Sequence, residues 1–391
     1  MSWVERSLDE LGFVSRGRSR HRPRDAAHLY GGPHPFIQTG DVKHAGLYLN
    51  EYEQTYSDAG LAQSRMWPAG TLCITIAANI AETSILGIDA CFPDSVIGFI
   101  PDEDKADARF VKYLFDTILR QRCKQFTQGA AQDNLSQGKL LSLKFSVPSV
   151  TEQKKIGDVL SAYDNLIENN RRRIQLLEQA ARLLYKEWFV HLRFPGHEHV
   201  KIKDGVPDGW EKRPLSEIAE ITMGQSPKSI YYNQDGNGLP FHQGVTNFGV
   251  RFPTHETYCT VQNRIAESGD ILFSVRAPVG RINITPDKII IGRGLAAIRS
   301  NCGQQNLLFY ALKSHFFKED MMGGGAIFAA ITKKDLYGVE LLQPSGQIAT
   351  MFMEHVIPID LQISNLQRAT EKLAKARDLL LPKLMNGEIP A

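Results

Sequence analysis

Two segments of the chain carry apolar side chains at a heptad spacing. Between residues 156 and 188, apolar or tolerated residues recur at steps of four and three. Residues 352 to 384 repeat this frame at a constant offset of 196. A 3.5-residue period sustained over several heptads is typical of coiled-coil helices, so we predict one long helix in each segment. The residues predicted to pair the helices are Leu160, Tyr163, Ile167, Ile174, Leu177, Leu184, Ile359, Ile363, Leu366, Leu373 and Leu380.

Each apolar stripe has two candidate partners, its own neighbouring domain or the other helix. A helix of ~33 residues is ~50 Å long, more than a globule of ~140 residues can cover. Two stripes of equal length and matching frame favour pairing with each other, and the chain connectivity favours an antiparallel arrangement. Since each buried leucine or isoleucine contributes ~1.5–3 kcal/mol, the pair would form a rigid spacer.

The segments between the helices predict mixed α/β domains. Short runs rich in β-branched residues are bounded by Gly, Pro and Asn, as expected of strands, and longer runs predict helices. We therefore expect an α+β protein, in which two mixed α/β domains form a pseudo-twofold repeat separated by an antiparallel coiled coil. The clearest strands are Leu72–Ala77, Ser95–Ile100, Asp270–Val275 and Lys288–Ile291, and the clearest helices are Ala108–Phe126 and Gln304–Phe317.

The two halves of the chain also share short matches in a fixed order, which indicates a duplicated unit of nearly 200 residues. The predicted boundaries are 1–148 and 205–344 for the domains, and 149–204 and 345–391 for the helical segments. The matches pair Trp3, Leu8 and Gly17 with Trp210, Leu215 and Gly224; Pro35–Gln38 with Pro240–Gln243; Pro68–Thr75 with Glu267–Ser274; Ile85–Ile88 loosely with Pro278–Ile282; and Phe145–Pro148 with Leu341–Pro344.

Composition restricts the class of protein. Five scattered cysteines without a C-x-x-C pair fit a reducing compartment, and no run approaches the ~20 apolar residues of a membrane span. We therefore expect a soluble, cytoplasmic protein. The net charge of +2 argues mildly against a protein that binds DNA alone, but allows one whose partners supply many phosphate contacts.

Candidate catalytic patterns are weak. Pro93-Asp94 followed by Glu103-Asp104-Lys105 has the spacing of a metal-dependent nuclease site, although an acidic turn before a helix explains it better. The Asn/Asp-Pro-Pro-aromatic motif and the glycine-rich cofactor loop of methyltransferases are missing, and Gly323–Gly325 lacks the end of a phosphate loop. His197 and His199 lack further ligands. We predict no catalytic residue, no metal site and no cofactor in this chain.

Polar residues suited to nucleic acid are more prominent. Five arginines fall within nine residues of a Gly/Pro-containing loop, where they either remain solvated or face phosphate. Other arginines and amides lie on glycine turns, from which they could reach base edges, although each is also compatible with an ordinary surface. The candidate DNA-binding residues are Arg16, Arg18, Arg20, Arg22, Arg24, Asn79, Gln132 and Asn134 in the first copy, and Gln225, Ser226, Lys228, Arg276, Arg281 and Arg293 in the second.

Taken together, several motifs resemble those of the specificity subunits of type I restriction-modification systems, over essentially the whole chain. Two departures affect the loops: Arg20 stands where the first copy would have proline, and Ala326–Ile331 replaces the Gln-x-Asn pair in the second. The motifs are Gly-x-Ser-Pro at Gly224–Pro227, the strand entry Gly269–Ser274, Gly129–Ser136, the run from Pro148 through Glu152–Ile156 to Ile167, and Leu380–Ile389.

The resemblance implies two target recognition domains, each of which reads one half of an asymmetric, interrupted DNA sequence. It also implies that the helices set the gap and dock two modification subunits, which bind S-adenosylmethionine and methylate adenine. Restriction subunits would add ATP- and Mg²⁺-dependent translocation and cleavage. The alternatives are a stand-alone nuclease or methyltransferase and a purely structural coiled-coil scaffold.

Overall fold

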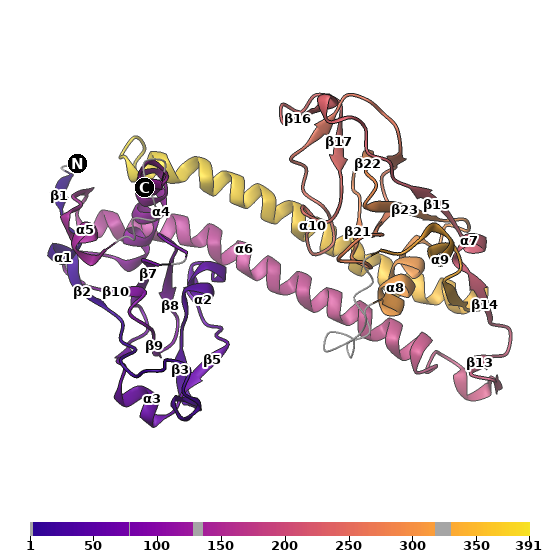
Figure 1. Cartoon of the computed structure of the whole chain (residues 1–391), viewed down its shortest axis with the longest axis horizontal. Helices are drawn as coiled ribbons and strands as arrows, with labels where there is room; N and C mark the ends of the chain where they lie inside the picture. Colours follow the sequence, from indigo (N-terminus) through magenta and orange to yellow (C-terminus); the bar gives the residue numbers. More distant parts are fainter. Residues whose placement is uncertain (1–2, 78, 128–135, 317–329) are drawn as a thin grey trace. The chain divides into compact units, whose positions relative to one another are not determined.

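The chain folds into two compact units. Unit 1 consists of residues 1–173 and 365–391, and unit 2 consists of residues 174–364. Helices α6 (Val150–Tyr185) and α10 (Gly346–Met385) cross these limits, so each unit contains one part of both helices. Among the described residues, no helix combines the length and apolarity needed to cross a bilayer. The computed structural model describes residues 3–77, 79–127, 136–316 and 330–391 (Figure 1).

Unit 1 builds its sheets from short strands, which are β1 (Val4–Arg6), β2 (Gly12–Arg16), β3 (Tyr30–Phe36), β4 (Tyr48–Leu49), β5 (Gln54–Tyr56), β6 (Met66–Trp67), β7 (Leu72–Thr75), β8 (Thr83–Leu86), β9 (Ala90–Cys91), β10 (Val96–Pro101) and β11 (Phe145–Val147). One sheet has the order β2-β10-β7-β8-β4 and a second has the order β5-β3-β9-β6, while β1 pairs with β11. Its shorter helices are α1 (Leu8–Leu11), η1 (Ala27–Leu29), α2 (Thr39–His44), α3 (Asp58–Ala62), α4 (Ala108–Thr127) and α5 (Gln137–Ser142).

Unit 2 uses a matching set of strands, which are β12 (Ile202–Lys203), β13 (Val206–Pro207), β14 (Glu211–Pro214), β15 (Ala219–Met223), β16 (Tyr232–Asn233), β17 (Leu239–His242), β18 (Tyr258–Cys259), β19 (Ile265–Ala266), β20 (Ile271–Ser274), β21 (Ile282–Ile284), β22 (Ile289–Ile291), β23 (Leu295–Ser300) and β24 (Glu340–Gln343). The sheets have the orders β15-β23-β20-β21 and β16-β18-β17-β22-β19, while β14 pairs with β24. Its shorter helices are η2 (Lys186–Val190), η3 (His197–His199), α7 (Leu215–Ile218), η4 (Ser229–Tyr231), α8 (Gln305–Phe316) and α9 (Lys333–Tyr337).

The strand orders confirm the predicted duplication of a mixed α/β domain. In unit 1, β10 is antiparallel to both β2 and β7, and in unit 2, β23 is antiparallel to both β15 and β20. The second sheet of each unit contains one short parallel pair, β3 with β9 and β17 with β22. Sheets with strands in both directions are common in α+β folds, so this arrangement fits the predicted fold class.

The turn after β20 shows where the repeat aligns. The Ser274 hydroxyl donates to the Pro278 carbonyl (2.6 Å) and accepts from the Arg281 N–H (2.8 Å). In the turn after β7, the Thr75 hydroxyl donates to a backbone carbonyl four residues on and accepts from the Glu82 N–H (3.0 Å). A small hydroxyl residue therefore closes both turns in the same way.

This geometry corrects one sequence match. Gly280 occupies the position of Ala81, and both residues have positive φ angles, of 85° and 66°. The loose alignment of Ile85–Ile88 with Pro278–Ile282 is therefore wrong, because strand β8 itself corresponds to β21. Because this positive-φ position holds glycine in one copy and alanine in the other, the comparison of the two sequences does not reveal the correct register.

In unit 1, the start of α6 packs beside the end of α10. Ile156 and Leu160 share one buried apolar cluster with Leu384 and Met385. Since these residues come from the first part of one helix and the last part of the other, the two helices are antiparallel there. Side chains of α4 and of the five-stranded sheet complete the same cluster, which joins the helices to the domain.

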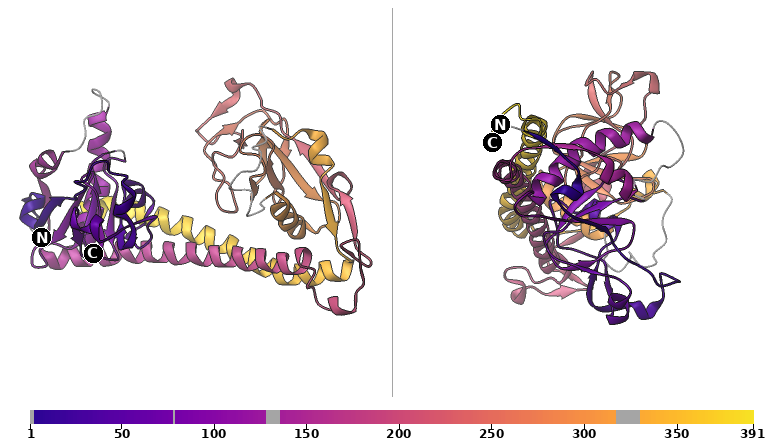
Figure 2. Two further views of the ribbon diagram at one scale, coloured as in Figure 1. Left: turned by 60° about the horizontal axis from the view of Figure 1, so that its bottom comes forward. Right: turned by 90° about the vertical axis from the view of Figure 1, so that its left-hand side faces the viewer.

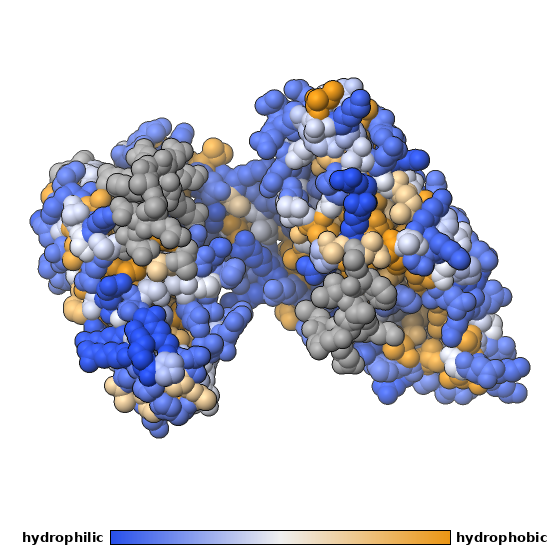
Figure 3. All heavy atoms as spheres, in the orientation of Figure 1, coloured by the Kyte–Doolittle hydropathy of each residue, from blue (hydrophilic) through white to orange (hydrophobic). Residues whose placement is uncertain are grey.

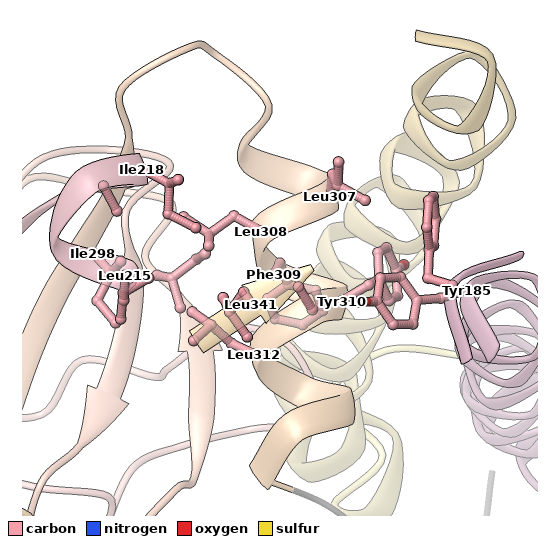
Figure 4. Packing of buried hydrophobic residues seen from close by; sticks show 14 of the residues in the cluster. Tyr185, Leu215, Ile218, Ile298, Leu307, Leu308, Phe309, Tyr310, Leu312 and Leu341 are labelled. Carbon is pink, nitrogen blue, oxygen red and sulfur yellow. The ribbon is translucent and has the colours of Figure 1, made fainter. Parts of the chain in front are cut away.

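In unit 2, the end of α6 packs beside the start of α10 (Figures 1 and 2). The ring centroids of Tyr185 and Phe352 lie 5.9 Å apart, and those of Tyr310 and Phe352 lie 6.1 Å apart. Figure 4 shows Tyr310 of α8 on the side of that helix that faces Tyr185, with Leu308 and Leu312 directed toward the sheet. Helix α8 thus lies between the sheet and the two long helices.

The burial of the long helices follows the heptad frame. Several leucines outside the frame are exposed, for example Leu166 (52%) and Leu176 (65%). One apolar face of each helix is therefore covered, and further apolar side chains remain on the outer faces. The predicted pairing residues Leu160, Ile167, Ile174 and Ile363 are buried, and Tyr163, Leu177, Leu184, Ile359, Leu366, Leu373 and Leu380 are half-buried.

Candidate nucleic-acid interface

Three loops of unit 2 meet at one edge of its sheets. The loop Gly224–Lys228 follows β15, residues 243–247 follow β17, and Gly292–Gly294 joins β22 to β23. The Gly224 N–H donates to the carbonyl of Leu295 (2.9 Å), which fixes the first loop against the start of β23. Residues far apart in the sequence are thereby brought together.

Glycines on both sides of Arg293 allow the backbone of Gln243 to approach. A Cβ atom on Gly292 would lie 2.9 Å from the Cα atom of Gln243, and one on Gly294 would lie 2.5 Å from its carbonyl oxygen. Real side chains do not tolerate such contacts, so both positions require glycine. Arg293, whose side chain is exposed, therefore belongs to a loop that packs against the backbone of Gln243.

Ser226 links the three loops. Its hydroxyl donates to Oε1 of Gln243 (2.8 Å) and accepts from the backbone N–H of Arg293 (3.1 Å). Both contacts hold exposed polar groups in a defined geometry. Gln225 lies next to Ser226, and its side chain is exposed.

A fourth loop brings two more arginines to this edge. The Val275 N–H donates to the carbonyl of Gly294 (2.9 Å), so Arg276 directly follows a residue bonded to the Arg293 loop. The side chains of Arg276 and Arg281 are exposed. The four loops, residues 224–228, 243–247, 275–281 and 292–294, contain four Lys or Arg and no Asp or Glu. Their charge suits a polyanion.

A histidine pair lies behind the edge. Nε2 of His242 lies 2.8 Å from Nδ1 of His255, and Nε2 of His255 lies 3.1 Å from a carboxylate oxygen of Asp287. Burial, aided by the neighbouring His255, lowers the pKa of His242 to about 4. His242 is therefore neutral at pH 7 and acts as a structural support.

In unit 1, the predicted arginine loop uses some guanidinium groups to hold its own shape. Arg24 donates to both carboxylate oxygens of Asp94 (2.9 Å each), and Arg16 Nε donates to the Asp94 carbonyl (2.9 Å). Arg22 donates to the backbone carbonyls of Ser19 and His21 (2.8 Å each). These groups are less available to an external ligand.

Arg18 and Arg20 differ from the other arginines of the loop. Their backbone N–H groups are bound, to the Phe92 carbonyl and to the Gln63 amide oxygen, while their side chains are exposed. In the part of the chain that the structure describes, neither guanidinium takes part in a hydrogen bond or ion pair. Arg18 corresponds to Gln225 of unit 2. The backbone N–H of each residue donates to a carbonyl at the end of the equivalent strand, which is β9 in unit 1 and β22 in unit 2.

The remaining candidates are more scattered. Asn79 is half-buried in the turn after β7, and Lys228 is exposed beside the Ser226 loop. Gln132 and Asn134 lie outside the described residues.

Two residues of the nuclease-like pattern, Asp94 and Lys105, are bound within the protein. Asp94 holds Arg24, and Lys105 pairs with Asp102 (2.6 Å). Over the described ranges, no group of three or more His, Cys, Asp or Glu side chains is placed to hold a metal ion.

Comparisons with known proteins agree with this picture. A family model described as "Type I restriction modification DNA specificity domain" matches residues 1–179 and 207–347. The chain is similar to the MjaX specificity subunit of a type I restriction enzyme from Methanocaldococcus jannaschii, with 34% identity over 296 residues, 74% of this chain and 70% of the relative. It is also similar to the MjaIX specificity subunit from the same organism, with 26% identity over 99% of this chain and 93% of the relative.

A solved structure shares the fold. The crystal structure of a type I restriction-modification system S subunit from M. genitalium superimposes with a TM-score of 0.63 at 15% sequence identity. The match covers 98% of this chain and 96% of that one, so the whole chain has a counterpart.

Proposed function

The chain belongs to the family of type I restriction-modification DNA specificity proteins, and we propose that it selects the target while partner subunits perform the chemistry. Two copies of the family domain fit the recognition of a target with two halves. The catalytic steps, methylation and cleavage, would take place in other chains. S-adenosylmethionine, ATP and Mg²⁺ would accordingly be bound by those partners, in the cytoplasm.

Each recognition domain, residues 1–148 and 205–344, would read one half of the target. The loop with the exposed Arg18 and Arg20 in unit 1 differs from the amide, hydroxyl and arginine edge around Ser226 in unit 2. Because the polar edges of the two domains differ, the two domains would recognise different half-sequences, and the complete target would be asymmetric. Of the predicted DNA-binding residues, those with exposed and unpaired side chains would touch DNA, while Arg22 and Arg24 would shape the loop.

The helical segments 149–204 and 345–391 would set the gap between the half-sites. With 36 and 40 residues, helices α6 and α10 are roughly 54 and 60 Å long at the standard rise of an α-helix. Half-sites one helical turn apart are separated by about 34–36 Å along B-DNA. The helices are therefore long enough to act as a measuring element.

The outer faces of the helices would dock two modification subunits, and restriction subunits would join through them. Leu166 and Val159 are exposed on the unit 1 part of α6, and Leu176 and Leu183 on its unit 2 part. Apolar residues spaced along a helix face are suited to a partner helix. Figure 3, by contrast, shows that the surface in that view is largely hydrophilic on both units.

The observation that carries the proposal is the duplicated domain with two unlike polar edges. The test is to reconstitute the chain with its modification subunit, supply S-adenosylmethionine and DNA, and sequence the methylated adenines. We expect one bipartite asymmetric motif, and no methylation or cleavage by this chain alone with Mg²⁺ and S-adenosylmethionine. Activity of the isolated chain would refute the division of labour.

A further inference from the structure

Gln243 combines exposure with a fixed side chain. Exposed glutamines usually sample several rotamers, at a conformational cost when they bind. Here the Ser226 hydroxyl donates to Oε1 of Gln243 at 2.8 Å, and the backbone packs between Gly292 and Gly294. The amide is thus oriented before any ligand arrives.

The hydrogen-bonding capacity left to this amide matches one base. Oε1 has two acceptor sites, of which Ser226 uses one, and no protein acceptor is bound to Nε2 among the described residues. One acceptor and one donor side by side suit the N6 amine and N7 of adenine in the major groove, a pair that glutamine binds in a bidentate manner. Arg293, whose backbone N–H donates to the same Ser226 hydroxyl, has an exposed side chain that would supply a positive charge for the nearby DNA backbone.

The equivalent residue of unit 1 is engaged differently. Gln38, which stands at the same place in the repeat, donates from Nε2 to Oε1 of Gln54 at 2.6 Å. One of the two N–H donors of this amide is therefore used inside the protein, which directs Nε2 toward Gln54. Gln38 thus offers a matched control on the same scaffold, with the same residue type and a similar exposure.

We propose that Gln243 is a specificity-determining residue that reads one adenine of the half-site of the second recognition domain, with Ser226 as its positioning residue. This assignment rests on the proposed function of the chain in DNA recognition. It adds a residue that the motif analysis did not select.

The test uses the complex of the full chain with its modification subunit. Initial methylation rates are measured on DNA libraries in which each target position is varied singly. Q243A should lose roughly 10- to 100-fold of the discrimination at one adenine of one half-site, with the other half-site unaffected. S226A should lose part of the same discrimination, and S226T should retain it. Q38A should discriminate like the wild type.

The outcomes separate the two levels of the proposal. A wild-type complex with a bipartite motif, together with unchanged discrimination in Q243A, would overturn the assignment of Gln243 alone. A rate loss in Q243A that is equal for all four bases would also overturn it, because it would indicate a backbone contact. A wild-type complex with no bipartite motif would instead refute the proposed function.

Discussion

Arg251 in unit 2 occupies the backbone position that Leu47 occupies in unit 1. The Arg251 carbonyl accepts from the Ile284 N–H at 2.8 Å, and the Leu47 carbonyl accepts from the Ile85 N–H at 3.0 Å. Ile284 and Ile85 are equivalent, since each pairs with the first residue of the neighbouring strand. A leucine in an apolar cluster thus corresponds to a buried arginine.

The arginine is surrounded by groups from both long helices. Arg251, only 1% exposed, donates to Glu178 of α6 (2.6 Å) and to Asp360 of α10 (2.8 Å). Tyr310 also donates to Asp360 (2.6 Å). Burial opposes the ionisation of Glu178, but Arg251 and Lys313 outweigh it and lower the pKa of this carboxyl.

In unit 1, different residues form the polar contacts between the domain and the two long helices. Tyr113 donates to Asp164 of α6 at 2.5 Å, as Tyr310 does to Asp360. The positive charge there comes from Arg377 of α10 rather than from the domain. Apolar packing joins the domain to the long helices in both units, and unit 2 adds a buried ion cluster centred on an arginine of the domain.

Removal of the Arg251 charge should destabilise unit 2 strongly. Because R251M leaves the buried Asp360 without its ion-pair partner and Glu178 with Lys313 alone, we expect a loss of about 3–5 kcal/mol in the free energy of unfolding, measured with urea. The triple variant R251M/E178Q/D360N should recover much of this loss. The exposed pair of Arg172 and Glu168 provides the control, since R172M should change stability by less than about 1 kcal/mol. Equal effects of R251M and R172M would contradict the cluster's role.

Two adjacent leucines of α6 should have different functions, one in the stability of the helix pair and the other in the binding of the modification subunit. Leu177 is half-buried in the predicted pairing frame, whereas Leu176 is exposed. L177D should lower the free energy of unfolding by about 2 kcal/mol or more, because a charge enters an apolar contact. L176D should keep the stability of the wild type but weaken binding to the modification subunit, measured by sedimentation. If L176D unfolds as readily as L177D, the outer face is structural. L373D on α10 should behave like L177D.

The exposed Arg18 and Arg20 of unit 1 should contribute to the salt dependence of DNA binding. Each phosphate contact that is lost reduces the slope of log K against log salt by about 1, so R18A/R20A should reduce it by about 2. Arg22, whose guanidinium donates to backbone carbonyls, is the control, and R22A should leave the slope close to that of the wild type. Titrations of the assembled complex by fluorescence anisotropy measure both. An unchanged slope in R18A/R20A would exclude phosphate contacts.

Much of the fold could be predicted because its signals are local or repeated. The heptad frame of Leu160 and its successors lies within one helix, and the duplication preserves residue types at turns and strands. The ion cluster could not be predicted, because Arg251 lies 73 residues from Glu178 and 109 from Asp360. In the sequence, such an arginine resembles any polar loop residue.

Only part of the candidate site can be predicted from the sequence, because some of its signals are local and others depend on contacts that the fold creates. Glycine turns and basic loops are visible in the sequence, so Ser226 and Arg293 were selected. Gln243 was missed, since its significance depends on contacts with both loops across 17 or more residues. The sequence also does not show which arginines of the basic loop are available to a ligand and which are bound within the protein, because only the fold places Asp94 against Arg24.

The stability of unit 2 should depend on pH through His242. Its pKa is lowered from 6.5 to about 4 in the folded state, so between these values the unfolded chain binds more protons. Stability should therefore fall by up to about 3 kcal/mol as the pH falls from 6.5 to 4, and remain constant above this window. H242N should flatten this part of the profile in urea titrations at several pH values. An equally steep profile for H242N would assign the dependence to other groups.

Lengthening both helices by one heptad should change the gap and not the half-sites. Asp164 meets Arg377 in unit 1, which places Asn170 near Glu371 on the facing helix. Seven residues inserted after Asn170 and seven after Glu371 preserve the heptad frame and add about 10 Å, close to three base pairs of B-DNA. Methylation sequencing should then show the same two half-sequences separated by a gap about three base pairs longer. An unchanged gap would mean that the partner subunits, and not these helices, determine the spacing.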